Sequence, residues 1–462
     1  METKISLAHL LVLTAGLLSL TMVTNTDPHT RKRSILMKHF VRSLCILSLF
    51  SFVILAQEAN WNQWRGPNST NHSLSTGIAN TWSEGGPKQL WKINTIGIGY
   101  SCFSFYEDMM FTMGDVGDQC WAFALNRNTG EIIWRQPVGR AGTGLGAGGR
   151  QAAQNSVGSL GTPACDGESV FVMGQYGDYV AYNMKDGKEL WRKNIFTDLG
   201  GDIQAGWGIS PSPIIDGDKI LLPIGGSGGT LGAFDKTGKL LWRTAGITNP
   251  MSYTSAVRVE IGGVRQYMLL AGIPGRDRGG VLAGISPTDG KVLWRIEFPG
   301  SVAICSDPVL CGDVVMAGCG YGVGAGFYRI TKEGNAFSAA QIHFDESLLS
   351  HHGGIVAVKD HFYLLSDRKG LTCIEAKTGN IVWENRSVGK GSLTYADGKL
   401  IVRSESGDGT VAMVEATPEG YKELGRFNQP DRSDRNSWTY PVVVGKKLYL
   451  RDQNVLLCYD LN

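Results

Sequence analysis

The chain of 462 residues contains 62 glycines and only 19% charged residues, whereas an average globular protein has about 7% glycine and about 25% charged residues. The 42% of hydrophobic residues, with 12 Trp and 15 Tyr, exclude a disordered polypeptide, and glycine without a three-residue period excludes collagen. Long helices are disfavoured because each interior glycine costs about 1 kcal/mol relative to alanine. The length allows either several domains or one repetitive domain.

The amino terminus, residues 1–56, has the features of a targeting segment. Residues 43–56 form an apolar run of 14 that follows basic residues and ends in a small residue, which is the three-part pattern of a secretory signal and too short to span a bilayer. A second apolar stretch covers residues 6–23. Because two tandem export signals are redundant, we expect translation to start at Met37, so that residues 1–36 are an extension assigned in error. A membrane anchor at residues 6–23 is the alternative.

Charge and export together limit the class of partner. Residues 1–56 hold six of the 44 Lys and Arg residues and two of the 42 Asp and Glu residues, so the remaining 406 residues carry a net charge of −2. Such a chain has no global positive field to attract nucleic acid or anionic lipid. We therefore expect an exported, periplasmic or extracellular protein of a bacterial cell envelope. Its mature chain should be a monomer with no nucleic-acid partner and no transmembrane segment.

A turn followed by an aromatic strand recurs along the chain after about residue 89. In the clear copies a glycine precedes a tryptophan by four residues. These copies span residues 128–134, 185–191, 236–242, 288–294 and 377–383. Two degenerate copies lead to Phe337 and Leu424. The spacing fits a unit of four short strands with a variable loop.

The remaining strands of each unit complete a four-stranded antiparallel blade. The last unit stops at Asn462 without its fourth strand, whereas the strand at residues 89–93 stands alone before the first unit. We predict that this strand completes the last blade and closes the ring, because closure leaves no exposed sheet edge. The expected fold is an all-β, eight-bladed β-propeller over residues 89–462, preceded by a lead-in at residues 57–88. The positions equivalent to the repeated tryptophan, one in each blade, are residues 91, 134, 191, 242, 294, 337, 383 and 424.

These repeats resemble the pyrroloquinoline-quinone (PQQ)-type propeller repeat. That repeat is shared by quinoprotein alcohol dehydrogenases and by BamB-type outer-membrane assembly proteins, and the segment Asn60-Trp61-Asn62-Gln63-Trp64-Arg65-Gly66-Pro67 resembles the start of many exported bacterial members. The resemblance implies the fold but leaves the activity open, because function resides in sites grafted on the fold.

The resemblance also implies what an active dehydrogenase of this type would contain. It would hold PQQ and calcium at one end of the channel, commonly with a disulfide between adjacent cysteines over the quinone. The chain has no adjacent cysteine pair, no haem-attachment Cys-x-x-Cys-His sequence and no Asp-x-Asp-x-Asp loop. Ligands could still converge from different blades. We expect no cofactor, with PQQ and calcium only under the alternative of a dehydrogenase that oxidises an alcohol or a sugar.

Four histidines lie within 19 residues, at positions 343, 351, 352 and 361. Imidazoles can bind a metal ion, but no pair has the spacing of a recognised site, so we predict no metal site and favour polar contacts. His351 and His352 stand out because they come at the start of an innermost strand, where side chains can line the central channel.

Other candidate residues lie where the repeat is broken. Trp207 and Trp438 are off the repeat position and near the starts of innermost strands. Charged residues of nearby loops are expected at the same rim of the propeller. The alternative is that these loops are solvated and form only ordinary ion pairs. We predict no catalytic residue. The candidate binding residues are Trp207, Arg276, Asp277, Arg278, His351, His352, Arg435 and Trp438.

The sequence-based hypothesis is a binding or scaffold protein of the envelope that presents rim loops to a protein or carbohydrate partner. A second hypothesis concerns Cys305 and Cys319, which are equidistant from Gly312. A simple hairpin would place them nearly opposite each other, so a cross-strand disulfide is possible in an oxidising compartment.

Overall fold

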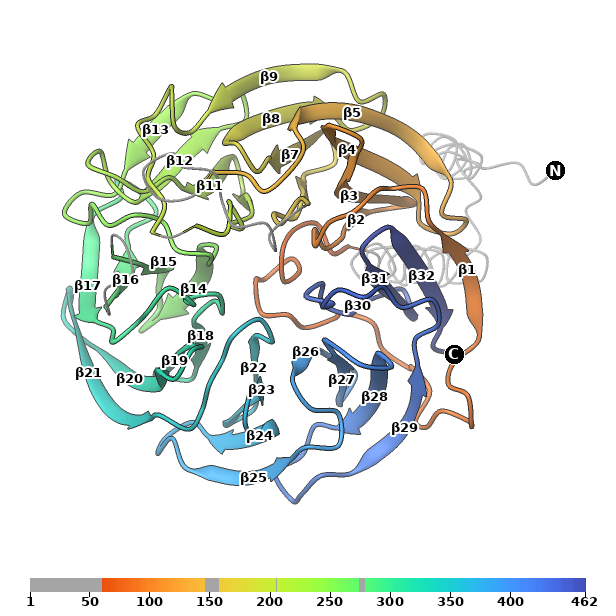
Figure 1. Cartoon of the computed structure of the whole chain (residues 1–462). Helices are drawn as coiled ribbons and strands as arrows, with labels where there is room; N and C mark the ends of the chain where they lie inside the picture. Colours follow the sequence, from red (N-terminus) through yellow and green to blue (C-terminus); the bar gives the residue numbers. More distant parts are fainter. Residues whose placement is uncertain (1–59, 146–157, 205, 274–278) are drawn as a thin grey trace, which may run out of the picture. The chain divides into compact units, whose positions relative to one another are not determined.

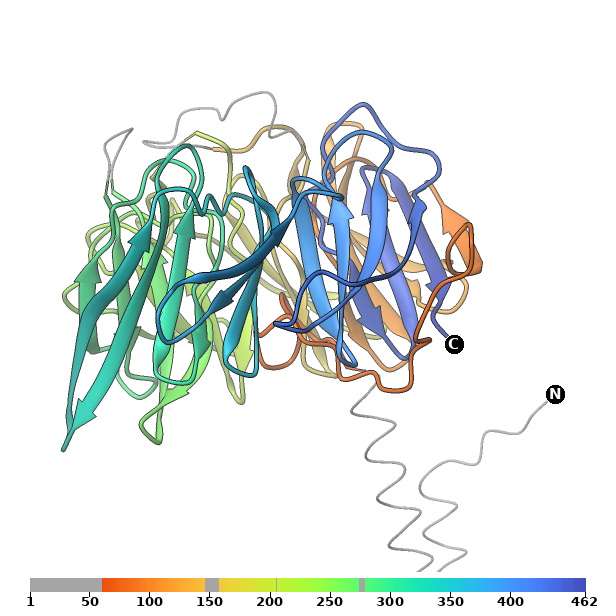
Figure 2. The same cartoon turned by 90° about the horizontal axis from the view of Figure 1, so that it is seen from below.

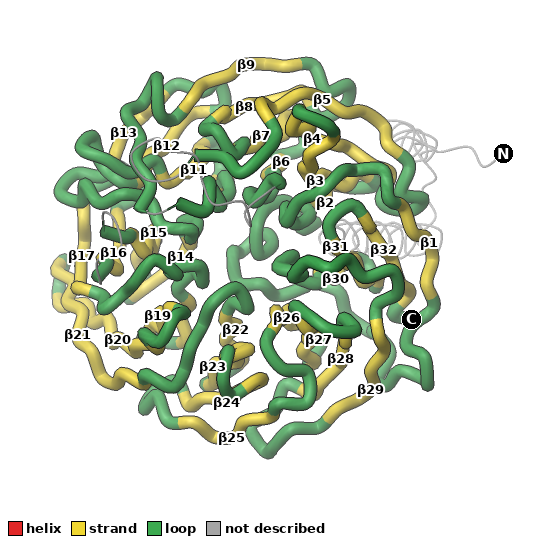
Figure 3. The backbone as a smooth tube through the Cα atoms, in the orientation of Figure 1, coloured by secondary structure: helices red, strands yellow, loops and turns green. Residues whose placement is uncertain are grey.

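Eight four-stranded antiparallel sheets stand around a central axis in the part of the chain that the structure describes (Figure 1). The computed structural model describes residues 60–145, 158–204, 206–273 and 279–462. The predicted signal and extension therefore lie outside the described residues. The rest belongs to the unit Glu58–Asn462. Strands and loops make up this unit (Figure 3), and none of its described segments is a helix long and apolar enough to cross a bilayer.

Each blade consists of four strands, ordered from the central axis outward. The first four blades are β2 (Ser104–Tyr106), β3 (Met109–Val116), β4 (Gln119–Asn126), β5 (Ile132–Arg140); β6 (Ala164–Cys165), β7 (Ser169–Met173), β8 (Asp178–Asn183), β9 (Glu189–Asn194); β10 (Ile214–Asp216), β11 (Lys219–Pro223), β12 (Leu231–Asp235), β13 (Leu240–Arg243); and β14 (Val257–Ile261), β15 (Val264–Ala271), β16 (Val281–Ile285), β17 (Val292–Glu297).

The other four blades are β18 (Val309–Cys311), β19 (Val314–Cys319), β20 (Gly324–Glu333), β21 (Ala336–Asp345); β22 (Ile355–Val358), β23 (His361–Ser366), β24 (Gly370–Glu375), β25 (Ile381–Asn385); β26 (Gly391–Ala396), β27 (Lys399–Ser404), β28 (Thr410–Glu415), β29 (Glu423–Asn428); and β30 (Val442–Val444), β31 (Lys447–Asp452), β32 (Val455–Asp460), β1 (Gln89–Ile93). The ten-residue strands β20 and β21 extend beyond the neighbouring hairpins at one end of the ring (Figure 2).

The predicted ring closure is confirmed. β1 pairs antiparallel with β32, so that Trp91 lies opposite Cys458 and Ile93 opposite Leu456. The amide of Asp460 also donates to the carbonyl of Lys88 at 2.8 Å. The outer strand of the eighth blade is therefore β1, from the amino-terminal side of the chain, as Figure 1 shows near the carboxyl terminus.

A β-bulge in every outer strand identifies the equivalent positions of the eight blades. The residue directly after the bulge is Trp91, Trp134, Trp191, Trp242, Trp294, His343, Trp383 or Gly425. The predicted equivalents of the repeated tryptophan in the fifth and seventh blades, residues 337 and 424, are therefore wrong. The β20–β21 hairpin is longer than the repeat, which moves its equivalent residue to His343. In the seventh blade, Leu424 lies within the bulge itself.

The repeated glycine and the repeated tryptophan belong to one contact between neighbouring blades. The indole Nε1 of Trp134, in β5, donates to the carbonyl of Met184 at 2.9 Å. Its ring covers Gly187 in the turn between β8 and β9, where an added Cβ would lie 2.8 Å from the indole. Gly187 also has φ of +73°, a conformation that favours glycine. The glycine is thus required both by the turn and by the ring of the preceding blade.

We expect Gly187→Ala to lower the free energy of unfolding by about 2 kcal/mol more than Gly217→Ala. Both positions have positive φ, but an added Cβ at Gly217 would meet nothing within 4 Å, so only Gly187→Ala adds overpacking to the backbone strain. Equilibrium denaturation of the two variants measures the difference, and equal losses would contradict the contact between Trp134 and Gly187.

The lead-in crosses the centre of the ring and contacts inner strands of successive blades, as the orange segment in the middle of Figure 1 shows. Its hydrogen bonds join Asn62 Nδ2 to Cys165 O (3.2 Å), Ile215 N to Gln63 Oε1 (2.7 Å), Trp64 Nε1 to Asp307 Oδ2 (2.6 Å), Arg65 Nη2 to Ile355 O (2.6 Å), Asn71 Nδ2 to Leu393 O (2.5 Å) and Ser73 Oγ to Val443 O (2.7 Å). The amide of Phe105, in β2, also donates to the carbonyl of Trp61 at 2.8 Å. The segment therefore plugs the channel and ties seven blades together.

The disulfide hypothesis is wrong for this structure, in which Cys305 and Cys319 are free thiols. The β18–β19 hairpin pairs Cys311 with Val314, and Cys305 lies upstream of β18, outside the paired strands. The thiol of Cys319 instead lies 3.7 Å from the hydroxyl of Ser301.

Stability should fall in mild acid because His72 of the lead-in is held neutral. Burial, and secondarily Arg65, lowers the pKa of His72 from 6.5 to about 4, and its ring packs on Tyr395 at 4.6 Å. The unfolded chain gains this proton below about pH 6.5, while the folded chain gains it only near pH 4. The folded state should therefore lose about 2 kcal/mol between pH 7 and pH 5 through this residue. Denaturation of wild type and His72→Phe at both pH values checks this, and parallel losses would contradict it.

Candidate binding site at one end of the central channel

A cavity of about 340 Å³, which we call the channel pocket, opens at one end of the channel. Most of its lining residues belong to the segments that lead into innermost strands, including Thr162 before β6, Ser212 before β10 and His352 before β22. Because all innermost strands surround one axis, these segments converge although they are far apart in the sequence.

A chain of hydrogen bonds connects five of these segments. The residues two positions before β2, β6, β10, β14 and β18 are Cys102, Thr162, Ser212, Ser255 and Asp307, and we call them the collar. Each backbone N–H donates to the side chain of the next member, at 3.2, 2.9, 2.9 and 2.8 Å in this order. The collar fixes the spacing of neighbouring blades and satisfies backbone groups that have no partner strand.

The floor of the pocket is built on the last collar residue and the lead-in. Asp307 accepts a hydrogen bond from Trp64 Nε1 at 2.6 Å and lies 3.7 Å from Nη1 of Arg65. Burial raises the pKa of Asp307, while Arg65 and the hydrogen bonds act in the opposite direction. Trp64 also packs against Tyr440, with ring centroids 4.8 Å apart, so the lead-in supplies an aromatic base to the cavity.

Aromatic side chains form most of the wall. We call Tyr100, Trp207, Tyr253, Tyr321 and Trp438 the aromatic wall. Tyr100 stacks on Trp438 at 4.4 Å, and Trp207 meets both Tyr253 and Tyr321 edge to face at 6.2 and 6.1 Å. Tyr321 is 55% exposed, which is uncommon for a large aromatic residue and places it at the mouth of the pocket.

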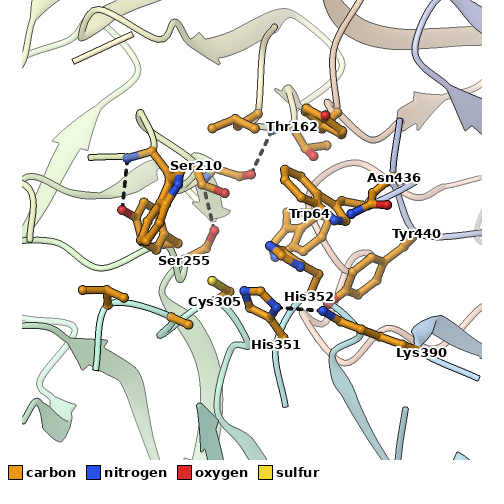
Figure 4. A pocket seen from close by; sticks show the side chains of 18 of the residues that line it. Trp64, Thr162, Ser210, Ser255, Cys305, His351, His352, Lys390, Asn436 and Tyr440 are labelled. Atoms are coloured by element: carbon orange, nitrogen blue, oxygen red, sulfur yellow. Dashed lines mark hydrogen bonds between the residues drawn. The ribbon is translucent and has the colours of Figure 1, made fainter. Parts of the chain in front are cut away.

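A cluster of nitrogen and sulfur groups occupies the remaining side (Figure 4). His351 and His352 lie with ring centroids 3.7 Å apart, and His352 stacks on Trp438 at 4.3 Å. Cys305 lies beside them, and one ligand atom from each of the three residues falls within 4.8 Å of the others. Lys390 Nζ makes a 2.9 Å hydrogen bond to Nδ1 of His351.

Two carboxylates stand behind this cluster. Lys390 Nζ lies 3.5 Å from Asp367 and 3.3 Å from Glu405. Burial raises the pKa of both carboxyl groups, with Lys390 opposing the shift. The ammonium and the two carboxylates thus form a partly buried ionic group, in which Lys390 offsets one of the two negative charges.

Burial also sets the protonation of His351, His352 and Cys305. It lowers the pKa of His351 to about 3, and Lys390 adds to the shift. It lowers the pKa of His352 well below its usual value, with smaller effects of His351 and Lys390. Burial raises the pKa of the Cys305 thiol. At neutral pH both imidazoles are therefore uncharged, and the thiol keeps its proton while no metal ion is bound.

The sequence places this propeller in a known group. The family model described as outer membrane protein assembly factor BamB, a PQQ-like repeat model, matches residues 121–360 and 334–458, which is more than half of the chain. The chain belongs to this PQQ-like repeat family. The predicted resemblance is therefore confirmed at the level of the family. Among curated proteins, none matches the chain by sequence.

Solved structures extend the likeness at low identity. BamB from Moraxella catarrhalis has a TM-score of 0.53 and 14% identity over 81% of this chain and 99% of that chain. Quinohemoprotein alcohol dehydrogenase ADHIIG from Pseudomonas putida HK5 has a TM-score of 0.62 and 14% identity over 88% and 81%. A europium-containing methanol dehydrogenase has a TM-score of 0.62 and 11% identity over 87% and 91%. At these identities the likeness shows the PQQ-like propeller fold alone.

The fold brings four of the eight candidate residues together. Trp207, His351, His352 and Trp438 all line the channel pocket. Arg435 lies close to Tyr100, where it opposes the rise in that phenol's pKa caused by burial. The candidates Arg276, Asp277 and Arg278 lie outside the described residues.

The other two histidines of the sequence cluster lie elsewhere. His343 is in the outer strand β21, and His361 begins β23 opposite Val358. The four histidines that are close in sequence therefore do not form one group.

Sequence reasoning missed several pocket residues, namely Trp64, Tyr253, Cys305, Tyr321 and Lys390. A positional signal could have found part of this set. Tyr253, Cys305 and Lys390 come one to four residues before an innermost strand, as His351, His352 and Trp438 also do. Trp64 and Tyr321 carry no such signal, because Trp64 comes from the lead-in and Tyr321 from the β19–β20 turn.

The described lining does not fit PQQ with calcium, the group that the dehydrogenases of this fold imply. Calcium takes six to eight oxygen ligands, usually including carboxylates. None of the described side chains that line the pocket is a carboxylate, and the nearby Asp367 and Glu405 are paired with Lys390. PQQ is itself a tricarboxylate, and Lys390 is the one cationic side chain among the described lining residues. The described lining residues thus fit neither calcium nor PQQ.

Removing the ammonium from the ionic group should destabilise the fold. In Lys390→Met, Asp367 and Glu405 keep their burial but lose their cation, so we expect a loss of about 2 kcal/mol at pH 7.5. The double variant Lys390→Met/Glu405→Gln should recover part of this lost stability, because it removes one of the two unpaired carboxylates. The matched control is Lys422→Met, which breaks an exposed pair with Glu415 and should cost less than about 1 kcal/mol. Chemical denaturation measures all three variants, and a control as costly as Lys390→Met would contradict the assignment.

Proposed function

We propose that the protein is an exported binding protein of the cell envelope and that the channel pocket holds a carbohydrate. The aromatic wall is the observation that carries this proposal. Its rings line a cavity that is open to solvent at Tyr321 and closed at its base by Trp64. This arrangement is a concave, mainly apolar site with a few polar groups, as ligand sites usually are.

The chemistry of the lining favours a sugar over other small ligands. Flat aromatic faces can stack on the C–H faces of a sugar ring and bury apolar area there. Hydroxyl and amide groups near the wall, from Thr162, Ser210, Ser255 and Asn436, can exchange hydrogen bonds with sugar hydroxyls. Lys390, the one cationic side chain among the described lining residues, is already paired with Asp367 and Glu405. It is therefore poorly placed to hold an anionic ligand, which favours an uncharged saccharide.

Binding without turnover is the simpler interpretation of this site. Hydrolysis of a glycosidic bond generally requires two carboxyl groups that flank the bond. The two nearest acids, Asp367 and Glu405, instead stand behind the histidines and contact Lys390. The protein is therefore proposed as a scaffold that holds a saccharide chain at one end of the propeller. The apolar run at residues 43–56 supports export.

Saccharide binding can be measured directly. We expect the purified protein to bind at least one member of a panel of neutral oligosaccharides, built from glucose, galactose, mannose, xylose or N-acetylglucosamine, with quenching of tryptophan fluorescence and a saturable heat in calorimetry. Trp207→Ala and Tyr321→Ala should each weaken that binding about tenfold or more, since each removes a stacking face.

The matched control is Trp121→Ala, because Trp121 lies outside the pocket, where Arg135 packs over its ring at 4.7 Å. This variant should bind the saccharide as the wild type does. Absence of binding across the panel, or binding that both pocket variants retain, would overturn the carbohydrate proposal. Capture of an envelope protein that depends on Trp207 and Tyr321 would favour a protein partner instead.

A further inference from the structure

We propose that Cys305, His351 and His352 form a binding site for a transition-metal ion that prefers thiolate and imidazole ligands, with Zn²⁺ as its representative. The site would lie in the wall of the channel pocket. The proposal does not depend on carbohydrate binding, because it rests on a different set of side chains.

The three side chains are already close to a coordinating arrangement. One ligand atom from each lies within 4.8 Å of the other two. Tetrahedral zinc with Zn–S of about 2.3 Å and Zn–N of about 2.0 Å requires ligand atoms about 3.3–3.6 Å apart. Movements of about 1 Å or less by each side chain would therefore close the triangle around an ion. Thiolate and imidazole are a donor set suited to zinc and copper, whereas calcium and magnesium prefer oxygen.

The local fold turns both imidazoles to the same side. Consecutive residues of an extended strand would point to opposite faces, but His351 and His352 lie in a bend before β22. Trp438 stacks on His352 at 4.3 Å with the rings inclined by 15°. Gly320 leaves room for the other ring, since an added Cβ there would lie 3.0 Å from His351. The two rings are thus held in place by packing.

Two of the three proposed ligand residues make no side-chain hydrogen bond in the described part of the chain. Nδ1 of His352 is buried there without a hydrogen bond, and the hydrogen bonds of the described residues include none from the Cys305 thiol. A buried polar atom without a partner costs about 1–3 kcal/mol. In Figure 4, the ring edge of His351 that faces away from Lys390 points toward the sulfur of Cys305. A metal ion between the thiol and the Nε2 atoms of the two histidines would give the Cys305 thiol the partner that it lacks.

The surroundings supply the outer groups that metal-bound histidines usually have. Nδ1 of His351 lies 3.8 Å from a carboxylate oxygen of Asp367, and Nδ1 of His352 lies 4.0 Å from one of Glu405. A carboxylate that accepts from Nδ1 fixes the tautomer that leaves Nε2 free for the metal, and Glu405 would reach Nδ1 of His352 by a shift of about 1 Å. Asp367, Glu405, a Cys305 thiolate and the Lys390 ammonium together carry a charge of −2, which matches a divalent cation.

Binding would proceed by exchange of a proton for the ion. The Cys305 thiol would lose its proton to solvent as the sulfur–metal bond forms, and His352 would bind through Nε2 with its proton on Nδ1. In His351 the Lys390 ammonium donates to Nδ1 at 2.9 Å, so the ring proton is on Nε2. As Nε2 binds the ion, this proton would transfer to Nδ1, and Lys390 would turn from that nitrogen to Asp367 and Glu405. Three protein ligands leave a fourth tetrahedral position, which would face the pocket and hold water or a pocket ligand.

Cobalt provides a spectroscopic test with the full protein, since Co²⁺ occupies zinc sites and reports thiolate ligation by an intense near-ultraviolet charge-transfer band. We expect Co²⁺ titration of the reduced protein to produce this band at one equivalent, Zn²⁺ to abolish it and excess Ca²⁺ to leave it unchanged. Cys305→Ser should lose the band. His352→Gln should weaken Co²⁺ binding about 100-fold.

Two further variants separate a metal site from a general effect on folding. Cys319→Ser removes another thiol, which lies against Ser301, and should keep the band and the affinity. Asp367→Asn should keep the band but weaken binding about 10–100-fold, because it acts through His351. Each variant is first checked by circular dichroism and thermal unfolding without metal.

Each outcome supports or overturns the metal site. A band that requires Cys305 and is displaced by Zn²⁺ supports it. Absence of a band, or a band that survives in Cys305→Ser or disappears in folded Cys319→Ser, overturns it. Metal binding without saccharide binding would support this site and contradict only the proposed function, and the reverse result would do the opposite.

Discussion

The pairing of β1 with β32 is the constraint on which the rest of the structure depends. It joins the two ends of a chain whose blades contact mainly their neighbours, and it gives the eighth blade the same four strands as the other seven. A closed ring fixes the direction of all eight innermost strands relative to one axis. The segments before those strands must then meet at one end of the channel, which is where the pocket forms.

Closure alone would leave an open channel, and two features of this chain turn it into a pocket. The lead-in passes through the centre and hydrogen-bonds to residues in or just before the innermost strands of seven blades, with Trp64 at the base. The collar links five blades side chain to backbone, from Cys102 to Asp307. Both meet at Asp307, which accepts hydrogen bonds from Trp64 and from the amide of Ser255. The base of the pocket and the spacing of the blades therefore share one buried carboxylate.

Sequence reasoning succeeded where the physical cause is local or repeated. The glycine–tryptophan spacing reflects a contact made in the same way between successive blades, as Trp134 and Gly187 show, so it is visible as a period. It failed where a blade departs from the period. The long β20–β21 hairpin moved the equivalent position from Phe337 to His343, and the free thiols of Cys305 and Cys319 show that distance from a turn does not establish pairing across it. Trp207, His351, His352 and Trp438 were selected as breaks in the repeat. Cys305 and Lys390 share the position shortly before an innermost strand but were not selected, and Tyr321, in the β19–β20 turn, carried no such signal.

The sequence by itself determined the all-β repeat, the number of blades and the closing strand, because each depends on short-range spacing or on a missing strand at one end and a surplus strand at the other. The tertiary structure alone decided which residues share the channel pocket. His351, Cys305 and Trp438 are separated by dozens of residues, and their proximity follows from the circular order of the blades and from the bend before β22. The glycines that first indicated a turn-rich chain serve both the repeat and the pocket. Gly187 belongs to the contact that recurs between blades, whereas Gly320 leaves the space that the ring of His351 occupies.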